Sequence, residues 1–154
     1  MAKGFTLIEL VVVISIIAIL TGGGLAVFSG FRSGRAALSD AQTVVDVLNE
    51  AKRLAVSAEK PTECSAVTLQ GYSVVVDATS LDLSAACLGG SPPTKTKNLT
   101  SGAVVGAPFS ATFKVLTGST QARTVDVCSQ GHLFRISITT AGSVSEPLEV
   151  AGGC

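Results

Sequence analysis

One carboxylate, that of Glu9, stands near the start of an apolar run that extends over residues 5–28. The run has about the length that an α-helix needs to cross a bilayer. An ionised carboxylate inside such a helix costs about 2.5–3.5 kcal/mol on insertion scales. The chemistry open to this stretch is therefore charge pairing in apolar surroundings, and we expect a positive partner for Glu9.

The other polar candidates give little support for catalysis, and we expect no catalytic residue, metal or cofactor. His132 is the only histidine and lies at the entrance of a predicted strand, where a turn or surface role is commoner than that of a general base. No nucleophile elbow, phosphate loop or metal-binding helix motif is present. Asp77 and Asp82 flank a predicted loop and could bind a cation, but solvated turn carboxylates are the commoner explanation. Asn98-Leu99-Thr100 matches a glycosylation acceptor pattern that is frequent by chance.

Four cysteines, Cys64, Cys87, Cys128 and Cys154, all lie beyond the apolar run. An even number in an exported domain favours two disulfides in an oxidising compartment. Three connectivities are possible. Because shorter loops close more readily, local closure favours Cys64 with Cys87 and Cys128 with Cys154. Zinc binding is poorly supported, since the spacings contain no two cysteines separated by only two to four residues.

Length and charge limit the number of domains and the kinds of partner that the chain beyond the apolar run can have. The chain has 154 residues, so the remainder is enough for one small domain, and a two-domain enzyme is not expected. Lys and Arg number 11, as do Asp and Glu. No block of like charge suggests a nucleic-acid-binding arm or a solvating tail. DNA binding therefore has no basic patch to support it.

Three interpretations of the N-terminus predict different mature proteins. A secretory signal peptide would be cleaved after the small residues near 21–24, but its apolar core would be unusually long and would contain Glu9. A plain membrane anchor would lose nothing and would leave Glu9 unexplained. The third interpretation depends on the order of residues around Gly4.

Gly4-Phe5-Thr6-Leu7-Ile8-Glu9 resembles the processing site of type IV pilins and the related pseudopilins. The shared features are a short basic leader, a Gly before the cut, a Phe after it and a Glu at the fifth mature position. The resemblance implies that a prepilin peptidase removes residues 1–4 and methylates the new amino group of Phe5, so that the apolar helix stays in the protein. It also implies an inner-membrane precursor in contact with lipid, an assembly platform, and other pilins as partners in a helical filament outside the cytoplasm.

The resemblance gives Glu9 a partner. Cleavage after Gly4 would place an α-amino cation at Phe5, and the positive end of the helix dipole also favours a carboxylate in the first turns. In the family, the Glu of an incoming subunit neutralises the amino group of its neighbour. Because an unpaired charge is costly in apolar surroundings, this pair would select the register between subunits.

Many pilins carry a proline halfway along the first helix, but this chain has Ala26 there, preceded by Gly22, Gly23 and Gly24. Three interior glycines each weaken a helix by roughly 1 kcal/mol relative to Ala. They could serve close helix packing, since Gly22-xxx-Ala26 is a small-xxx-small spacing. They could also mark a segment that melts when the subunit enters a filament.

Beyond the apolar run the pattern becomes that of an amphipathic helix that extends to about Ala58, before Pro61. The apolar stripe consists of Leu38, Ala41, Val44 or Val45, Leu48, Ala51, Ala55 and Ala58, and the other faces carry Asp40, Asp46, Glu50, Lys52, Arg53 and Glu59. The expected fold is α+β, the pilin fold, with a long N-terminal helix packed on an antiparallel sheet. We expect a leader at residues 1–4, a membrane or filament-core half-helix at 5–31, an amphipathic half-helix at 32–60 and a β-rich head at 61–154.

Short segments in the head are rich in β-branched and aromatic residues and predict strands at 67–69, 72–76, 111–116, 124–127 and 133–139. Phe134, Ile136 and Ile138 alternate with polar residues, which predicts one buried and one solvated face. Ala141-Gly142 can turn the chain toward Val144. Residues 89–93 are expected to form a loop, and residues 95–98 to be exposed.

Two functional classes remain open. The favoured one is a structural subunit of a type IV pilus or pilus-like filament, and the alternative is a membrane-tethered or secreted binding domain that does not assemble. Within the filament class, Ala51-Lys52-Arg53-Leu54-Ala55 and Gly71-Tyr72-Ser73-Val74 resemble H-type pseudopilins of type II secretion. Two disulfides suit a durable major pilin instead. The sequence does not choose among adhesion, motility, DNA uptake and protein export.

Overall fold

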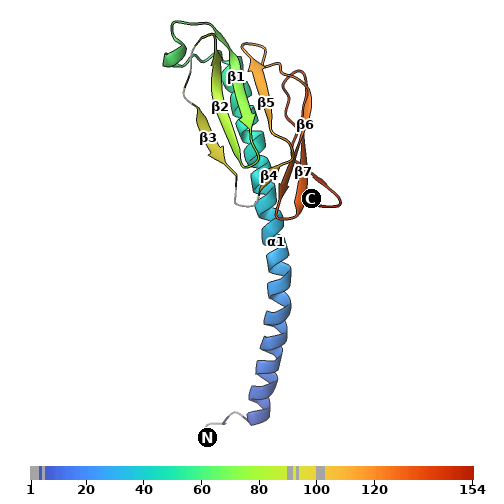
Figure 1. The fold of residues 1–154 in the computed structure, drawn as a ribbon. Helices are drawn as coiled ribbons and strands as arrows, with labels where there is room; N and C mark the ends of the chain where they lie inside the picture. The colour runs from blue at the N-terminus through green and yellow to red at the C-terminus, as the bar shows by residue number, and fades with distance from the viewer. Residues whose placement is uncertain (1–3, 5, 90–91, 93, 100–102) are drawn as a thin grey trace. The chain divides into compact units, whose positions relative to one another are not determined.

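A computed structural model describes residues 4, 6–89, 92, 94–99 and 103–154, and for residues 22–29 it describes the backbone only. The chain divides into two compact units, Met1–Gly34 and Arg35–Cys154. Each unit is described by itself below. The expected α+β class is confirmed, since one long helix is followed by antiparallel strands (Figure 1).

Helix α1 extends over Leu7–Val56 and crosses the boundary between the units. Two hydroxyl groups in the first unit are satisfied within the helix. Ser15 Oγ donates to the carbonyl of Val11 at 2.8 Å, and Thr21 Oγ1 donates to the carbonyl of Ile17 at 2.6 Å. Such back-bonding gives both hydroxyl groups a partner that does not depend on water.

Helix α1 ends two residues earlier than expected, at Val56. The amide of Glu59 donates to the carbonyl of Leu54 at 3.3 Å, and that of Ala58 donates to the carbonyl of Ala55 at 3.2 Å. Together with the positive φ of 52° at Ala58, these bonds form a Schellman motif. The helix therefore stops by its own C-terminal cap, and Pro61 instead precedes the short 3₁₀ helix η1, Thr62–Cys64.

The head contains two four-stranded antiparallel sheets. The first has the order β3-β2-β1-β5, made of Lys95–Asn98, Ser80–Cys87, Leu69–Val76 and Phe109–Lys114. The second has the order β4-β6-β7-β8, made of Val104–Val105, Arg123–Ser129, His132–Ile138 and Leu148–Val150. In the second unit, strands β1, β2 and β5 lie over α1 (Figure 1).

The core of the second unit lies between α1 and the inner faces of the sheets. The helix contributes a stripe of small and aliphatic residues with the predicted spacing: Ala37, Ala41, Val44, Val45, Val47, Leu48, Ala51 and Ala55. Ala58 is outside this stripe, because it belongs to the cap rather than to the helix. Phe113 is fully buried among the strands.

The strand predictions were partly right. Strand β7 has the predicted alternation, with Phe134, Ile136 and Ile138 buried, and the turn after it leads to a bridge between Ile138 and Val144. Residues 67–69 and 72–76 were predicted as separate strands. Residues 69–76 instead form the single strand β1, because Gly71 is itself paired with Ala86 of β2. Strands β2, β4 and β8 were not predicted, and exposed residues 95–98 form strand β3. Most of the loop predicted at 89–93 lies outside the described residues.

Two disulfides join the cysteines in the pairing that local loop closure favoured. Cys64 pairs with Cys87, at a Cα–Cα distance of 6.0 Å, and Cys128 pairs with Cys154, at 5.9 Å. The first ties η1 to the end of β2. The second ties the last residue of the chain to β6. All four cysteines are thereby used.

Candidate functional site: the helix start and its carboxylate

Thr6 and Glu9 form a capping box at the start of α1. The amide of Glu9 donates to Thr6 Oγ1 at 3.3 Å, and the amide of Thr6 lies 3.5 Å from Glu9 Oε2. The two side chains thereby satisfy backbone donors that a helix start leaves unpaired. The Thr-x-x-Glu spacing of residues 6–9 is the sequence signal of this local role of Glu9, which the sequence analysis missed.

The carboxylate of Glu9 retains capacity for a second partner. Glu9 is exposed, and a carboxylate offers about four acceptor positions, of which the capping bond occupies one. The bond from Thr6 is also long for a hydrogen bond to a charged acceptor. A cation from outside the helix could therefore bind Glu9 without dismantling the cap.

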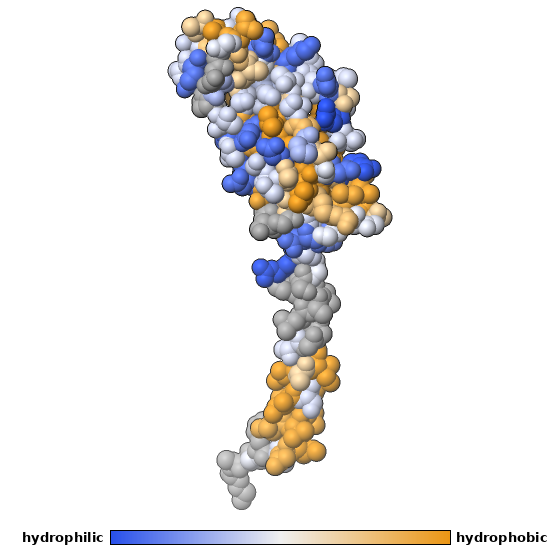
Figure 2. All heavy atoms as spheres, in the orientation of Figure 1, coloured by the Kyte–Doolittle hydropathy of each residue, from blue (hydrophilic) through white to orange (hydrophobic). Residues whose placement is uncertain are grey.

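Large apolar side chains surround this carboxylate and are exposed on every side of the helix. Leu7 is 82% exposed, Ile14 57% and Ile19 75%. Figure 2 shows hydrophobic residues gathered along this part of α1. A helix that is apolar all round is usually buried against lipid or protein. In the part of the chain that the structure describes in full, no helix is both long and apolar enough to span a membrane.

The other residues predicted to serve processing and flexibility lie near this helix start and farther along α1. Gly4 is exposed and precedes the helix, and a Cβ built on it would meet no atom within 4 Å. Phe5 lies outside the described residues. Gly22 to Gly24 lie within α1. Whether the segment melts remains a prediction.

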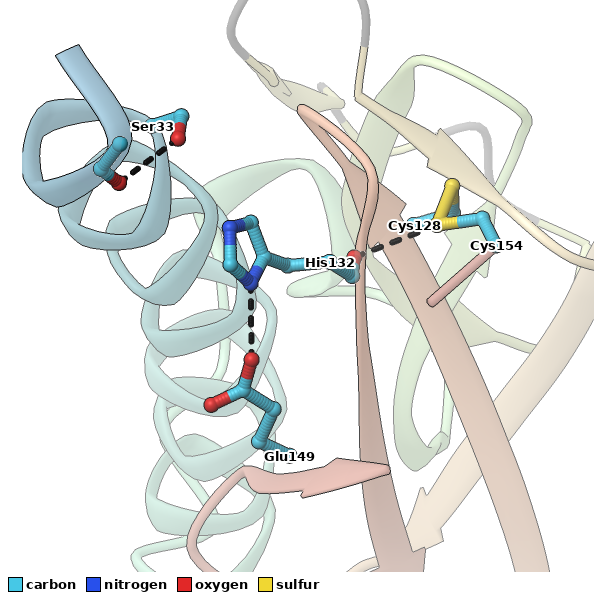
Figure 3. Close-up of polar contacts among 6 residues, drawn as sticks. Ser33, Cys128, His132, Glu149 and Cys154 are labelled. Atoms are coloured by element: carbon cyan, nitrogen blue, oxygen red, sulfur yellow. Dashed lines mark hydrogen bonds and ion pairs between the residues drawn. A yellow bond between two sulfur atoms is a disulfide. The ribbon is translucent and has the colours of Figure 1, made fainter. Parts of the chain in front are cut away.

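His132 has a structural role at the C-terminal edge of the head. Its Nδ1 lies 2.7 Å from Glu149 Oε1, which joins the start of β7 to β8. The Cys154 Sγ lies 3.3 Å from the carbonyl oxygen of His132, beside the disulfide to Cys128 (Figure 3). These contacts hold the last strand and the chain end on the second sheet.

The possible cation site at Asp77 and Asp82 is not supported. Asp77 begins the turn after β1, where its amide donates to the carbonyl of Ser80 at 2.9 Å. Asp82 was expected to flank a loop but lies within β2, where Thr96 Oγ1 donates to it from β3. Among the described residues, no group of three His, Cys, Asp or Glu side chains is placed to hold a metal. Asn98 ends β3 in an exposed position, and Thr100 lies outside the described residues.

Asp40 was assigned to a polar face of the helix but is buried, with 3% of its surface exposed. Ser129 Oγ, itself buried, donates to Asp40 Oδ2 at 2.8 Å. This bond joins α1 to the end of β6, next to Cys128. Burying a carboxylate is tolerated only where hydrogen bonds replace its water.

A second carboxylate is held by a cross-strand ion pair on the exposed face of the second sheet. Arg135 Nε and a terminal nitrogen donate to the two oxygens of Asp126 at 2.7 and 2.8 Å. The hydrogen bond from Arg135 is the largest effect and holds the pKa of the Asp126 carboxyl below its usual range. Burial opposes this shift, and the charge of Arg135 adds a smaller lowering of the pKa.

The fold and the helix start together define a class. A long N-terminal helix followed by antiparallel sheets is the pilin fold, and the helix opens with a carboxylate among apolar side chains. Residues 1–25 match the family described as the prokaryotic N-terminal methylation motif. The chain therefore carries the class III prepilin signal of type IV pilins and pseudopilins. Comparison with curated proteins and with solved structures found no match.

The motif also gives a coarse outline of how the protein matures. The motif is typical of membrane-anchored precursors of the pilin or pseudopilin type, which a prepilin peptidase processes and which assemble with other pilins. It is a structural motif and not an enzymatic one.

Proposed function

We propose that this chain is a structural subunit of a type IV pilus or of a closely related pilus-like filament. The class III prepilin signal in residues 1–25 carries the proposal. Residues 1–4 are the leader, residues 5–31 the half-helix that leaves the membrane for the filament core, residues 32–60 the half-helix beneath the head, and residues 61–154 the head. The β domain is the part that faces outward.

Processing comes first in this proposal. The peptidase cleaves after Gly4, which is exposed and clear of neighbouring atoms, and methylates the new amino group of Phe5. The intact mass of the protein purified from membranes tests this step. We expect the loss of Met1 to Gly4 and the gain of one methyl group. An unprocessed chain would instead indicate a plain anchor, and the loss of the whole apolar run would indicate secretion.

Assembly depends on the second role of Glu9. In the proposed filament its carboxylate pairs with the Phe5 amino group of a neighbouring subunit, in surroundings from which water is excluded. Exposed apolar side chains on all faces of residues 7–20 of α1 supply the surface that packs against neighbouring helices. The cost of leaving either charge unpaired then selects the correct register.

The capping box makes a sharp test possible. Gln serves at the third helical position of a capping box as Glu does, but it carries no charge. Glu9→Gln should therefore keep the helix start and normal processing, yet give several-fold fewer filaments in the fraction sheared from cells. Glu9→Asp, which keeps the charge on a shorter side chain, is the matched comparison and should lose less. If Glu9→Gln assembles as well as the wild type, Glu9 acts only as a cap and the charge-pairing role is wrong.

A further inference from the structure

The outer edge of β5 pairs with no second strand in the part of the chain that the structure describes. Strand β5 pairs with β1 on one side and is the last strand of its sheet on the other. The Lys114 amide donates to the carbonyl of Ser119 at 2.9 Å, and the Lys114 carbonyl accepts from the Gly118 amide at 2.8 Å. Both groups of Lys114 thus point away from β1. Because this direction alternates along an antiparallel strand, the backbone groups of Thr112 and Ser110 point the same way.

A groove lies along this edge. It is bounded by the outward residues of β5 and by residues 119–123, which lead into β6 of the other sheet. Its lining combines hydroxyl groups, such as those of Ser110, Thr112 and Thr120, with the cations Lys114 and Arg123. No Asp or Glu occurs among the described residues that line it. The outward main-chain groups of Lys114 are already bonded to residues 118 and 119, so the groove offers those of Ser110 and Thr112 for hydrogen bonds to another strand. It also offers positive charge toward both ends.

Neither cation has a carboxylate partner within the described part of the chain. The guanidinium of Arg123 lies over the ring of Phe109, 5.3 Å from its centre, which fixes it at one end of β5. A Lys beside an open edge also disfavours the addition of neutral or basic strands. The edge is thus selective for an extended segment that carries negative charge.

The same chain presents such a segment at the opposite edge of its other sheet. Strand β8 pairs only with β7 and is the last strand of its sheet. Leu148 in β8 is 69% exposed. Glu149 is already paired with His132, whereas Glu146, just before the strand, is exposed and has no ion-pair partner among the described residues.

We propose that the C-terminal edge of one copy, residues 145–150, adds to the β5 groove of the next copy, with Glu146 facing Lys114. Such a contact joins two different surfaces of identical subunits, and contacts of that kind build open helical assemblies rather than closed dimers. The inference rests on the proposed function and adds to it a contact between heads. The attraction comes from main-chain bonds to the outward groups of Ser110 and Thr112, to which Pro147 of the added segment can contribute only its carbonyl. The charges choose the strand.

Charge reversal tests the pairing in full-length protein assembled in its own cells. Lys114→Glu and Glu146→Lys should each lower the amount of sheared filament several-fold, and the double variant should recover much of it. Lys97→Glu and Glu63→Lys, at exposed positions on β3 and η1, are the matched controls and should assemble normally. Wild-type yields from both single reversals, or no recovery in the double variant, would overturn the proposal.

A second pair of variants tests the main-chain contact. Thr112→Pro removes an outward N–H without removing a bond to β1, whereas Thr112→Ala keeps that N–H and removes only the side chain. We expect fewer filaments from the proline variant alone, at an unchanged content of both disulfides and an unchanged tyrosine fluorescence. Equal yields from the two variants would contradict strand addition. If these variants assemble normally while Glu9→Gln does not, the filament function stands and the head contact is wrong. If the wild-type chain is neither processed nor assembled, both are wrong.

Discussion

The buried pair of Asp40 and Ser129 anchors the helix to the strand that carries Cys128. The hydroxyl of Ser129 replaces water on a carboxylate that the head encloses almost completely. Its removal takes a buried donor away from that carboxylate, and such losses cost about 1–3 kcal/mol. Ser129→Ala should therefore lower the free energy of unfolding by about that amount, measured by urea denaturation followed by circular dichroism.

Ser137→Ala is the comparison for this measurement. Ser137 lies in β7 with its side chain exposed, so its replacement should change the free energy of unfolding by no more than about 0.5 kcal/mol. Similar losses for the two variants would mean that the buried bond contributes nothing beyond the general effect of a serine substitution in this sheet.

Tyr72 reports on the junction between the helix end and the first sheet. Its hydroxyl donates to the carbonyl of Glu59 at 2.6 Å, and the side chain is nearly buried. Burial, and then the negative charge of Glu59, raise the pKa of the Tyr72 hydroxyl above its ordinary value of 10.0. The unfolded chain therefore loses this proton at a lower pH than the folded chain. The contribution to stability is complete below about pH 10 and is lost as the pH rises through the raised pKa.

Because Tyr72 is the only tyrosine and the chain has no tryptophan, the titration can be followed directly by phenolate absorbance. We expect a midpoint above that of the denatured protein. Tyr72→Phe should be less stable by about 0.5–1.5 kcal/mol near neutral pH, because it lacks the bond to Glu59. It should also lose less stability than the wild type between about pH 9 and pH 11. A wild-type midpoint equal to that of the denatured chain would contradict this account.

At the scale of elements, local patterns predicted the helix and several strands but not how they end or pair. The apolar stripe of α1 was readable because it repeats every three or four residues, and β7 because it alternates strictly. Strand β2 was missed because Ser80–Cys87 is rich in Ser and Ala, which have little strand preference of their own. It is a strand because β1 and β3 pair with it on both sides.

The residues of the candidate site likewise fall into those that local sequence identifies and those that it does not. Glu9 could be identified from sequence because its significance comes from its neighbours in the chain, and the capping box with Thr6 is equally local. The bond between Asp40 and Ser129 could not, because it joins residues that are 89 positions apart. No helical pattern distinguishes a carboxylate that meets such a partner from one that meets water.

The turn after β7 depends on a glycine for both conformation and space. Gly142 has φ of 73°, and a Cβ at this position would lie 2.0 Å from the carbonyl oxygen of Gly118. Gly131 has a similar φ of 81°, but a Cβ there would meet nothing within 4 Å. Gly131→Ala should therefore cost only the conformational penalty, about 1–2 kcal/mol. Gly142→Ala should cost clearly more, because backbone atoms must move.

Thermal unfolding of the two alanine variants measures this difference. The conformational penalty is nearly common to both, so the gap between their melting temperatures reports the steric term. Equal melting temperatures would show that the turn relaxes freely and that the close approach of residues 118 and 142 does not constrain it.

At the scale of the whole molecule, the two units depend on different surroundings. Every residue of the hydrophobic core lies between Ala37 and Ile138, within the second unit, and both disulfides close there as well. The described part of the first unit instead exposes its apolar side chains and stabilises its start with the capping box. One unit can thus be completed by its own chain, whereas the apolar surface of the other is left exposed and, under the proposed function, is covered by lipid or by neighbouring subunits.

This division predicts that a fragment of residues 35–154, exported to an oxidising compartment, folds alone. We expect a soluble monomer with both disulfides, a cooperative thermal transition, and a melting temperature close to that of the head in the detergent-solubilised full-length protein. The reason is that the fragment keeps Ala37, Asp40 and the rest of the core stripe. A fragment that starts at residue 49 lacks Ala37, Asp40, Ala41, Val44, Val45, Val47 and Leu48, and it should fail to fold or should aggregate. Circular dichroism and size-exclusion chromatography compare the two. If the longer fragment also lacks a cooperative transition, the head depends on the first unit and the division of roles is wrong.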